Sequence, residues 1–114
     1  MNASPAILIV CDHDALFREA LRNFLLAAGY VNVEVAATMR DALIMLCCEC
    51  YGHILIDVST PFSHGRRLAA IARKRQPEAK ILCLLSAQDQ PFARDASCEY
   101  VMKEYVFSNL LGLM

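Results

Sequence analysis

The sequence lacks most of the features that would place it outside the class of globular domains. Tryptophan is absent, and the 114 residues include only four glycines and four prolines, so no low-complexity or proline-rich linker divides the chain. The longest unbroken apolar run, residues 42–48, has seven residues, far short of the roughly 20 that a membrane-spanning helix needs. We therefore expect one domain over residues 1–114 and no membrane segment.

No charge of one sign dominates either. Lys and Arg number 11 and Asp and Glu 12, for a formal net charge of -1. A chain so close to neutrality has no general attraction for nucleic acid or for an anionic membrane. The first ten residues carry no Lys or Arg ahead of their apolar stretch, which is a poor match to a secretory signal.

Apolar residues are plentiful, at 57% of the chain against 20% charged, which is enough for a hydrophobic core. The six cysteines are Cys11, Cys47, Cys48, Cys50, Cys83 and Cys98. Since two of them lie in apolar runs and no secretory signal precedes them, we expect reduced thiols packed as small hydrophobes, in a cytoplasmic protein. Residues 47–50 have His53 nearby but no second ligand pair for zinc, so packing at a helix end is expected, with metal or redox function as the alternative.

Short apolar runs alternate with amphipathic stretches along the chain. Continuous apolar runs at 6–11, 54–58 and 81–85 predict strands covered on both faces, as in a parallel sheet, and 31–36 and 98–102 are weaker strand candidates. Helices are predicted over 15–28, 38–50, 65–75 and 104–113. Strands that alternate with helices predict an α/β fold with helices on both faces of one sheet.

Polar side chains follow four of the predicted strands. Asp12 follows the first strand, Asp57 ends the third, Ser86 follows the fourth and Lys103 the fifth. In a parallel sheet these strand ends meet at one edge, where ligands usually bind. Two carboxylates that lie close together repel each other, which favours binding of a divalent cation such as Mg²⁺. A carboxylate beside a cation, a lysine and a hydroxyl can act as a nucleophile toward a phosphoryl group.

Four segments together resemble a known family: ILIVCDHDALFREAL (7–21), HILIDVSTPFSHG (53–65), ILCLLSA (81–87) and EYVMK (99–103). From about residue 6 to 111 the chain is similar to the receiver domain of bacterial two-component response regulators, and LFREAL resembles the first helix of receivers that regulate transcription. The resemblance implies a flavodoxin-like three-layer sandwich with a five-stranded parallel sheet in the order 2-1-3-4-5. It also implies a sensor histidine kinase as partner, with room for a homodimer or for an effector domain cut away from a longer regulator.

The resemblance assigns a metal site by position. Asp57 matches the phosphoacceptor, Asp12 matches an acidic metal-binding residue, and Ser59 falls where the family uses a backbone carbonyl as metal ligand. His13 stands where a second acid is usual, unless the register slips to Asp14. Imidazole is a poor Mg²⁺ ligand, so weak metal binding is expected.

The other implied site residues are Ser86 as the hydroxyl on the phosphoryl group, Lys103 as the invariant lysine, Tyr100 as the aromatic switch, and Gly65 after the acceptor loop. Glu104 stands where proline is common, so the usual cis bond is not expected. Thr60 precedes Pro61 where a large apolar residue is usual. Only 16 residues separate Ser86 from Lys103, and Pro91 interrupts them, which predicts that the fourth helix is short or missing.

Each of these residues also has a purely structural interpretation. Asp57 or Asp12 would then cap a helix, and His13 and Lys103 would be solvated side chains. Ser86 would form a turn and Tyr100 would belong to the core or its rim. The basic residues of 66–75 are expected on the wet face of a helix, with a docking patch as the alternative.

The prediction is a phosphoacceptor switch in two-component signalling, and not an enzyme in its own right. The alternative is a degenerate receiver that serves as a phosphorylation-independent interaction or dimerisation module, which His13, Glu104 and the short fourth helix favour. A small flavin- or nucleotide-binding enzyme of the same fold is disfavoured, because no glycine-rich phosphate loop follows the first strand.

Overall fold

The computed structural model describes residues 6–11, 14–58, 62–86 and 99–114, with only the backbone described for 62–64. The five strands are β1 (Ala6–Val10), β2 (Val33–Ala36), β3 (Tyr51–Asp57), β4 (Lys80–Leu85) and β5 (Glu99–Met102). The helices are α1 (Ala15–Ala27), α2 (Met39–Cys48), α3 (Phe62–Arg75) and α4 (Val106–Leu113), and a 3₁₀ turn, η2 (Lys103–Tyr105), leads into α4.

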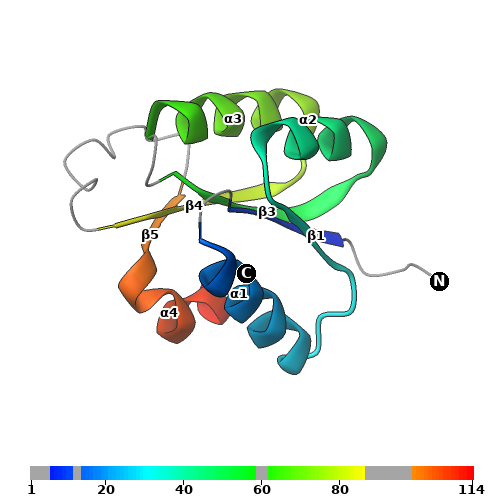
Figure 1. Ribbon diagram of the computed structural model, residues 1–114. Helices are drawn as coiled ribbons and strands as arrows, with labels where there is room; N and C mark the ends of the chain where they lie inside the picture. Colours follow the sequence, from blue (N-terminus) through cyan, green and yellow to red (C-terminus); the bar gives the residue numbers. More distant parts are fainter. Residues whose placement is uncertain (1–5, 12–13, 59–61, 87–98) are drawn as a thin grey trace.

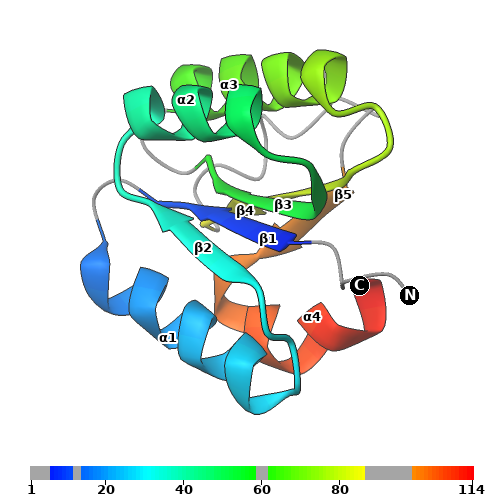
Figure 2. The same cartoon turned by 90° about the vertical axis from the view of Figure 1, so that its right-hand side faces the viewer.

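All strand pairs are parallel, in the order β2-β1-β3-β4-β5. The predicted α/β class and strand order are therefore confirmed. Helices α2 and α3 cover one face of the sheet and α1 and α4 the other (Figure 1; Figure 2 shows the same layers from the side). The fourth helix that was predicted to be short or missing falls on residues 87–98, which lie outside the described residues, and α4 is the C-terminal helix.

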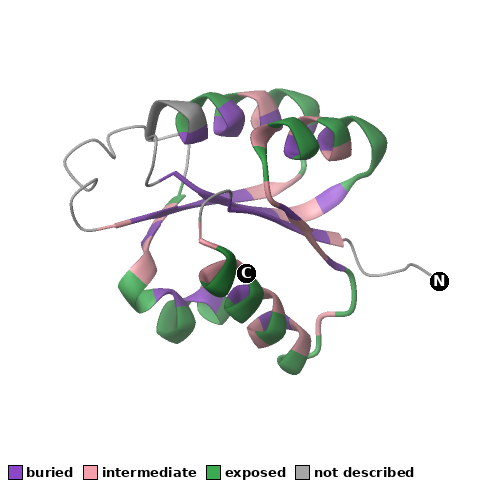
Figure 3. Ribbon diagram, in the orientation of Figure 1, coloured by how far each residue is buried: buried purple, intermediate pink, exposed green. Residues whose placement is uncertain are grey.

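Two apolar cores lie on the two faces of the sheet. In β1, Leu8 and Val10 belong to the core beneath α2 and α3, while Ile7 and Ile9 belong to the core over α1 and α4. Successive strand residues point to opposite faces, so an unbroken apolar run serves both cores at once. Figure 3 shows the result, with buried strands inside helices whose outer faces are exposed.

The helix ends follow local rules that the sequence carries. Thr38 caps α2, since its Oγ1 accepts a hydrogen bond from the Asp41 N–H at 3.0 Å, as the Thr-x-x-Asp pattern indicates. Gly29, at φ 107°, follows the end of α1 in a left-handed conformation that suits glycine. The cap of α1 is Asp14, whose Oδ1 accepts from the Phe17 N–H at 3.0 Å. The capping role considered for Asp12 therefore belongs to Asp14.

A buried glutamine that the sequence analysis overlooked joins β3 to α2. Gln76 is 8% exposed, and its Oε1 accepts the Tyr51 N–H at 2.8 Å. Its Nε2 donates to the Leu46 carbonyl at 2.9 Å and also to the Glu49 carbonyl. This contact holds the start of β3, so the strand begins at Tyr51 and not at residue 54 as predicted.

The cysteines divide into two groups. Cys11 and Cys83 are buried, as expected for thiols within apolar strands, and Cys98 lies outside the described residues. Cys47, Cys48 and Cys50 are exposed, so the predicted packing of these three at a helix end is wrong. The reason is that α2 buries Ala42 and Leu46, and the residues that follow Leu46 lie off that face. In the described parts of the chain no helix is long and apolar enough to cross a membrane.

Candidate functional site

Asp57 ends β3 in the middle of the sheet, and its side chain is fully buried, with 0% of its surface exposed. Three buried residues, Ile54, Leu55 and Ile56, bring the strand to this point. β1 and β4 flank β3, with Val10 beside Ile56 and Leu84 beside Asp57. A carboxylate in such a place is unfavourable unless donors or cations compensate it.

Lys103 supplies the compensating charge. It opens η2 directly after β5, and its Nζ lies 2.8 Å from Asp57 Oδ2, with 18% of its side chain exposed. Nζ also lies 4.5 Å from the centroid of the Phe17 ring, on α1. An ammonium that meets both a carboxylate and an aromatic face in a largely dry site is held in one position. The structure thus brings the predicted pair Asp57 and Lys103 into direct contact.

Cys11 is a third member of this cluster, and sequence reasoning did not assign it a functional role. It follows β1, is 1% exposed, and its Sγ lies 3.3 Å from Asp57 Oδ2 and 3.4 Å from the Asp14 carbonyl oxygen. Burial, and next the negative charge of Asp57, raise the pKa of the Cys11 thiol to about 11. The thiol therefore stays protonated at neutral pH and can donate to the carboxylate. Its position beside Asp12 at a strand end was the signal, but its apolar neighbours favoured a core interpretation.

Arg18 ties this end of β1 to α1. Its Nη1 donates to the Cys11 carbonyl oxygen at 2.7 Å, one helical turn after the Asp14 cap. The backbone around Cys11 is thereby fixed from two sides, by the cap and by the guanidinium.

Gly65 is required by a close approach between α3 and the residue after β3. A Cβ built at Gly65 would lie 2.5 Å from Val58 Cγ1 and 2.6 Å from Val58 Cα. Distances below 3.0 Å are not tolerated, so a larger residue would push α3 away from the end of β3. The glycine noted in the sequence after the acceptor loop therefore has a steric cause.

Of the remaining predicted site residues, the structure describes Ser86 and Tyr100. Ser86 directly follows β4 at the same sheet edge and is half-buried. Tyr100 lies in β5 opposite Cys83, is half-buried and packs against the core beneath α2 and α3. Asp12, His13 and Ser59 lie outside the described residues, as do Thr60 and Pro61. Their predicted roles stay predictions.

The described residues contain only part of the predicted metal site. Asp57 offers carboxylate oxygens, but no group of three His, Cys, Asp or Glu residues suited to a metal occurs in the ranges described above. Asp14 Oδ1 is engaged in the helix cap, and the Cys11 thiol is a soft donor that Mg²⁺ does not favour. A hard oxygen site would have to be completed by Asp12 and the Ser59 carbonyl.

Comparison with known families resolves what kind of domain carries this cluster. The family model of the response regulator receiver domain matches residues 7–109. The chain belongs to this family. The resemblance seen in the sequence is thereby confirmed, and with it the assignment to a family of two-component signalling domains.

Solved structures agree with this assignment. A CheY-like receiver domain protein from Methanospirillum hungatei is 29% identical, with a TM-score of 0.81, 97% of this chain covered and 90% of that chain. The response regulator TrrA from Thermotoga maritima, solved in complex with Mg²⁺ and beryllium fluoride, is 25% identical, with a TM-score of 0.79 and 95% of each chain covered. An adenylate cyclase from Rhodopirellula baltica, 21% identical with a TM-score of 0.82 over 97% of this receiver and 84% of that chain, shares the fold. No match was found among curated proteins.

Proposed function

We propose that this receiver domain is a phosphorylatable switch, in which Asp57 accepts a phosphoryl group from the phosphohistidine of a sensor histidine kinase. The observation that carries the proposal is the 2.8 Å contact between Lys103 Nζ and Asp57 Oδ2 at the carboxyl edge of the sheet. The Lys103 ammonium, which already contacts the Asp57 carboxylate, would also stabilise the negative charge of the incoming phosphoryl group. A pathway of this kind would operate in the cytoplasm and pass its signal to an effector domain or protein.

In the proposed reaction an Asp57 carboxylate oxygen attacks phosphorus. The bond between phosphorus and the kinase imidazole nitrogen breaks, an acyl phosphate forms, and the nitrogen keeps the electron pair of the broken bond. Lys103 would stabilise the added phosphoryl oxygens through its ammonium group. The Ser86 hydroxyl would donate to one of these oxygens, and Tyr100 would change its packing in response.

Mg²⁺ is the cation that we propose for this site. Asp57, Asp12 and the Ser59 carbonyl would hold it, and when bound it would neutralise charge on the phosphoryl oxygens. The neutral Cys11 thiol brings no charge for a cation, and His13 brings a weak ligand, so we expect this domain to need a high Mg²⁺ concentration.

One observation favours the second candidate, a phosphorylation-independent interaction module. Asp57 is fully buried, and both Lys103 and the Cys11 thiol approach the same oxygen, Oδ2. A carboxylate that its own neighbours satisfy is stable without phosphorylation. In that case the cluster would serve only to hold the ends of β1, β3 and β5 together.

Mass spectrometry after incubation with acetyl phosphate and Mg²⁺ distinguishes the two candidates. We expect the wild-type chain to gain the mass of one phosphoryl group and Asp57→Asn to gain none. Asp41→Asn, which removes an exposed carboxylate in the first turn of α2, is the matched control and should behave as wild type. A folded wild-type chain that gains no mass, and whose NMR spectrum does not respond to Mg²⁺ with beryllium fluoride, would exclude the switch and leave the interaction module.

A further inference from the structure

A groove between α2 and α3 has no part in the proposed phosphoryl chemistry. The two helices lie side by side on one face of the sheet (Figure 2). The groove has a volume of about 400 Å³, which falls in the range of roughly 300–1,000 Å³ seen for small-molecule sites. Its lining residues are Leu43, Leu46, Cys47, Ile71, Lys74 and Arg75.

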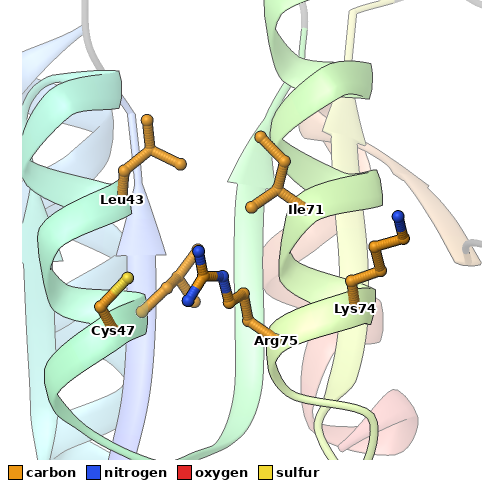
Figure 4. A pocket seen from close by; sticks show the side chains of 6 residues that line it. Leu43, Cys47, Ile71, Lys74 and Arg75 are labelled. Carbon is orange, nitrogen blue, oxygen red and sulfur yellow. The ribbon is translucent and has the colours of Figure 1, made fainter.

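The groove is apolar inside and cationic at its edge. Leu46 is buried, while Leu43 and Ile71 are half-buried and face each other from the two helices (Figure 4). The Arg75 side chain extends from α3 toward α2 across the lower end of the groove, whereas Lys74 lies on the outer side of α3. None of the lining residues is acidic.

The cationic side chains at the edge of the groove are those of Lys74 and Arg75. Helix α3 contains Arg66, Arg67, Arg73, Lys74 and Arg75 and no Asp or Glu. Neither Lys74 nor Arg75 belongs to an ion pair among the residues described. Cations in a last turn suit the negative end of the helix dipole, which accounts for their presence in α3. The dipole does not require that a guanidinium lie over an apolar groove.

The cationic end of the groove and Asp57 lie at opposite ends of the strands. The residues of the groove run from Leu43, in the middle of α2, and Ile71 of α3 to the C-terminal turns of both helices, where Arg75 lies. In parallel β-α-β units the helices run opposite to the strands, so these helix ends lie at the edge where the strands begin. Asp57 and Lys103 lie at the other edge, where the strands end. A ligand in the groove would therefore leave the phosphoacceptor accessible.

We propose that the groove between α2 and α3 binds a small amphipathic carboxylate. Its apolar body would lie against Leu43, Leu46 and Ile71, and its carboxylate would receive two parallel hydrogen bonds from the Arg75 guanidinium. A planar fork of donors matches a carboxylate, and the exposed guanidinium can reach a ligand whose body lies between the two helices. Charge and shape thus select the same class of ligand, an organic acid with a compact hydrocarbon body.

Octanoate is the probe for this site. In a titration of the ¹⁵N-labelled full chain under reducing conditions, we expect saturable shifts of the amide signals of Leu43, Cys47 and Ile71. Acetate lacks the apolar body and 1-octanol lacks the charge, so both should bind at least about tenfold more weakly than octanoate, the ratio expected for the loss of a charged hydrogen bond or of several buried methylenes.

Two arginines on the same helix provide a matched pair of variants. Arg75→Gln should weaken octanoate binding about tenfold, while Arg67→Gln, an equal change of charge at an exposed position outside the groove, should leave it unchanged. The dispersion of the NMR spectrum reports that each variant is folded.

Three outcomes would overturn the proposal. Equal binding of octanoate and octanol would mean an apolar groove without anion selectivity. Equal weakening by both arginine variants would mean diffuse attraction to the whole of α3. Shifts caused by an acidic leucine-containing peptide but not by octanoate would assign the groove to a protein partner. Each outcome is independent of whether Asp57 is phosphorylated.

Discussion

At the scale of single residues, the cluster around Asp57 depends on how one buried carboxylate is satisfied. Lys103 contributes charge, and the Cys11 thiol contributes a neutral donor at 3.3 Å from the same oxygen. Removing a donor from a buried charged group leaves that group partly desolvated without compensation. The thiol therefore contributes to stability through a polar contact, in addition to its packing.

Substitution of Cys11 tests this contribution. Cys11→Ala should lower the free energy of unfolding by about 1–2 kcal/mol, because the carboxylate loses a donor and the core loses a sulfur atom. Cys11→Ser keeps a donor of similar size and should lose clearly less. Urea denaturation followed by circular dichroism measures both variants, and equal losses for Ala and Ser would show that the sulfur acts only by packing.

Gly65 and Gly112 form a matched pair of glycines in helices. Gly65→Ala should destabilise the chain by about 1–3 kcal/mol, because the new methyl group would lie 2.5 Å from Val58 Cγ1. Gly112→Ala, in α4, has no atom within 4 Å of the new Cβ and should stabilise by about 0.4–1 kcal/mol. Thermal unfolding compares the two, and a tolerated Gly65→Ala would mean that α3 can shift away from β3 freely.

At the scale of helices and strands, local sequence carries much of the structure. The apolar runs predicted β1, β3 and β4, the two weaker strand candidates correspond to β2 and β5, and Thr38 with Asp41 predicted the start of α2. The contact between Asp57 and Lys103 was predicted because both residues stand at strand ends, whereas two other contacts between distant segments were not, because no strand-end rule marks them. Cys11 and Asp57 are 46 residues apart, and Gln76 reaches Tyr51 across 25 residues. The residues next to Cys11 and Gln76 in the sequence do not predict these contacts.

The start of α2 tests whether the side chain of Thr38 stabilises the helix as its N-cap. Thr38→Ala removes the acceptor for the Asp41 N–H and should lower the free energy of unfolding by about 1 kcal/mol. Thr38→Ser keeps the hydroxyl and should lose only a few tenths of that amount. Chemical denaturation of both variants gives the comparison, and a neutral Thr38→Ala would mean that water replaces the cap.

At the scale of the whole molecule, pH acts on the edge where the strands begin. His53 lies in β3 beside Lys80 of β4, and burial, followed by the Lys80 charge, lowers the pKa of its imidazole. The unfolded chain, with an ordinary histidine pKa near 6.5, then takes up this proton before the folded chain does. The contribution of His53 to stability is therefore intact above about pH 6.5 and declines as the pH falls below it.

Replacement of the imidazole isolates this effect. The stability of His53→Gln should fall less than that of wild type between pH 7.5 and pH 5.5, roughly one unit either side of the ordinary pKa, because glutamine does not titrate. Other groups contribute equally to both proteins, so the difference between the two denaturation curves reports His53. If the stability of both proteins changed with pH to the same extent, the His53 imidazole would have the same pKa in the folded and unfolded chain.

The order in which the strands leave the ribosome differs from their order in space. β1 is made first but lies between β2 and β3, and Lys103 follows the last strand to appear, at the far edge of the sheet. The four strands β2, β1, β3 and β4 lie side by side without β5, so they can pair before Lys103 is brought to Asp57. Until β5 docks, the Asp57 carboxylate has the neutral Cys11 thiol but not its cation, and docking of the last strand completes the electrostatic balance of the domain.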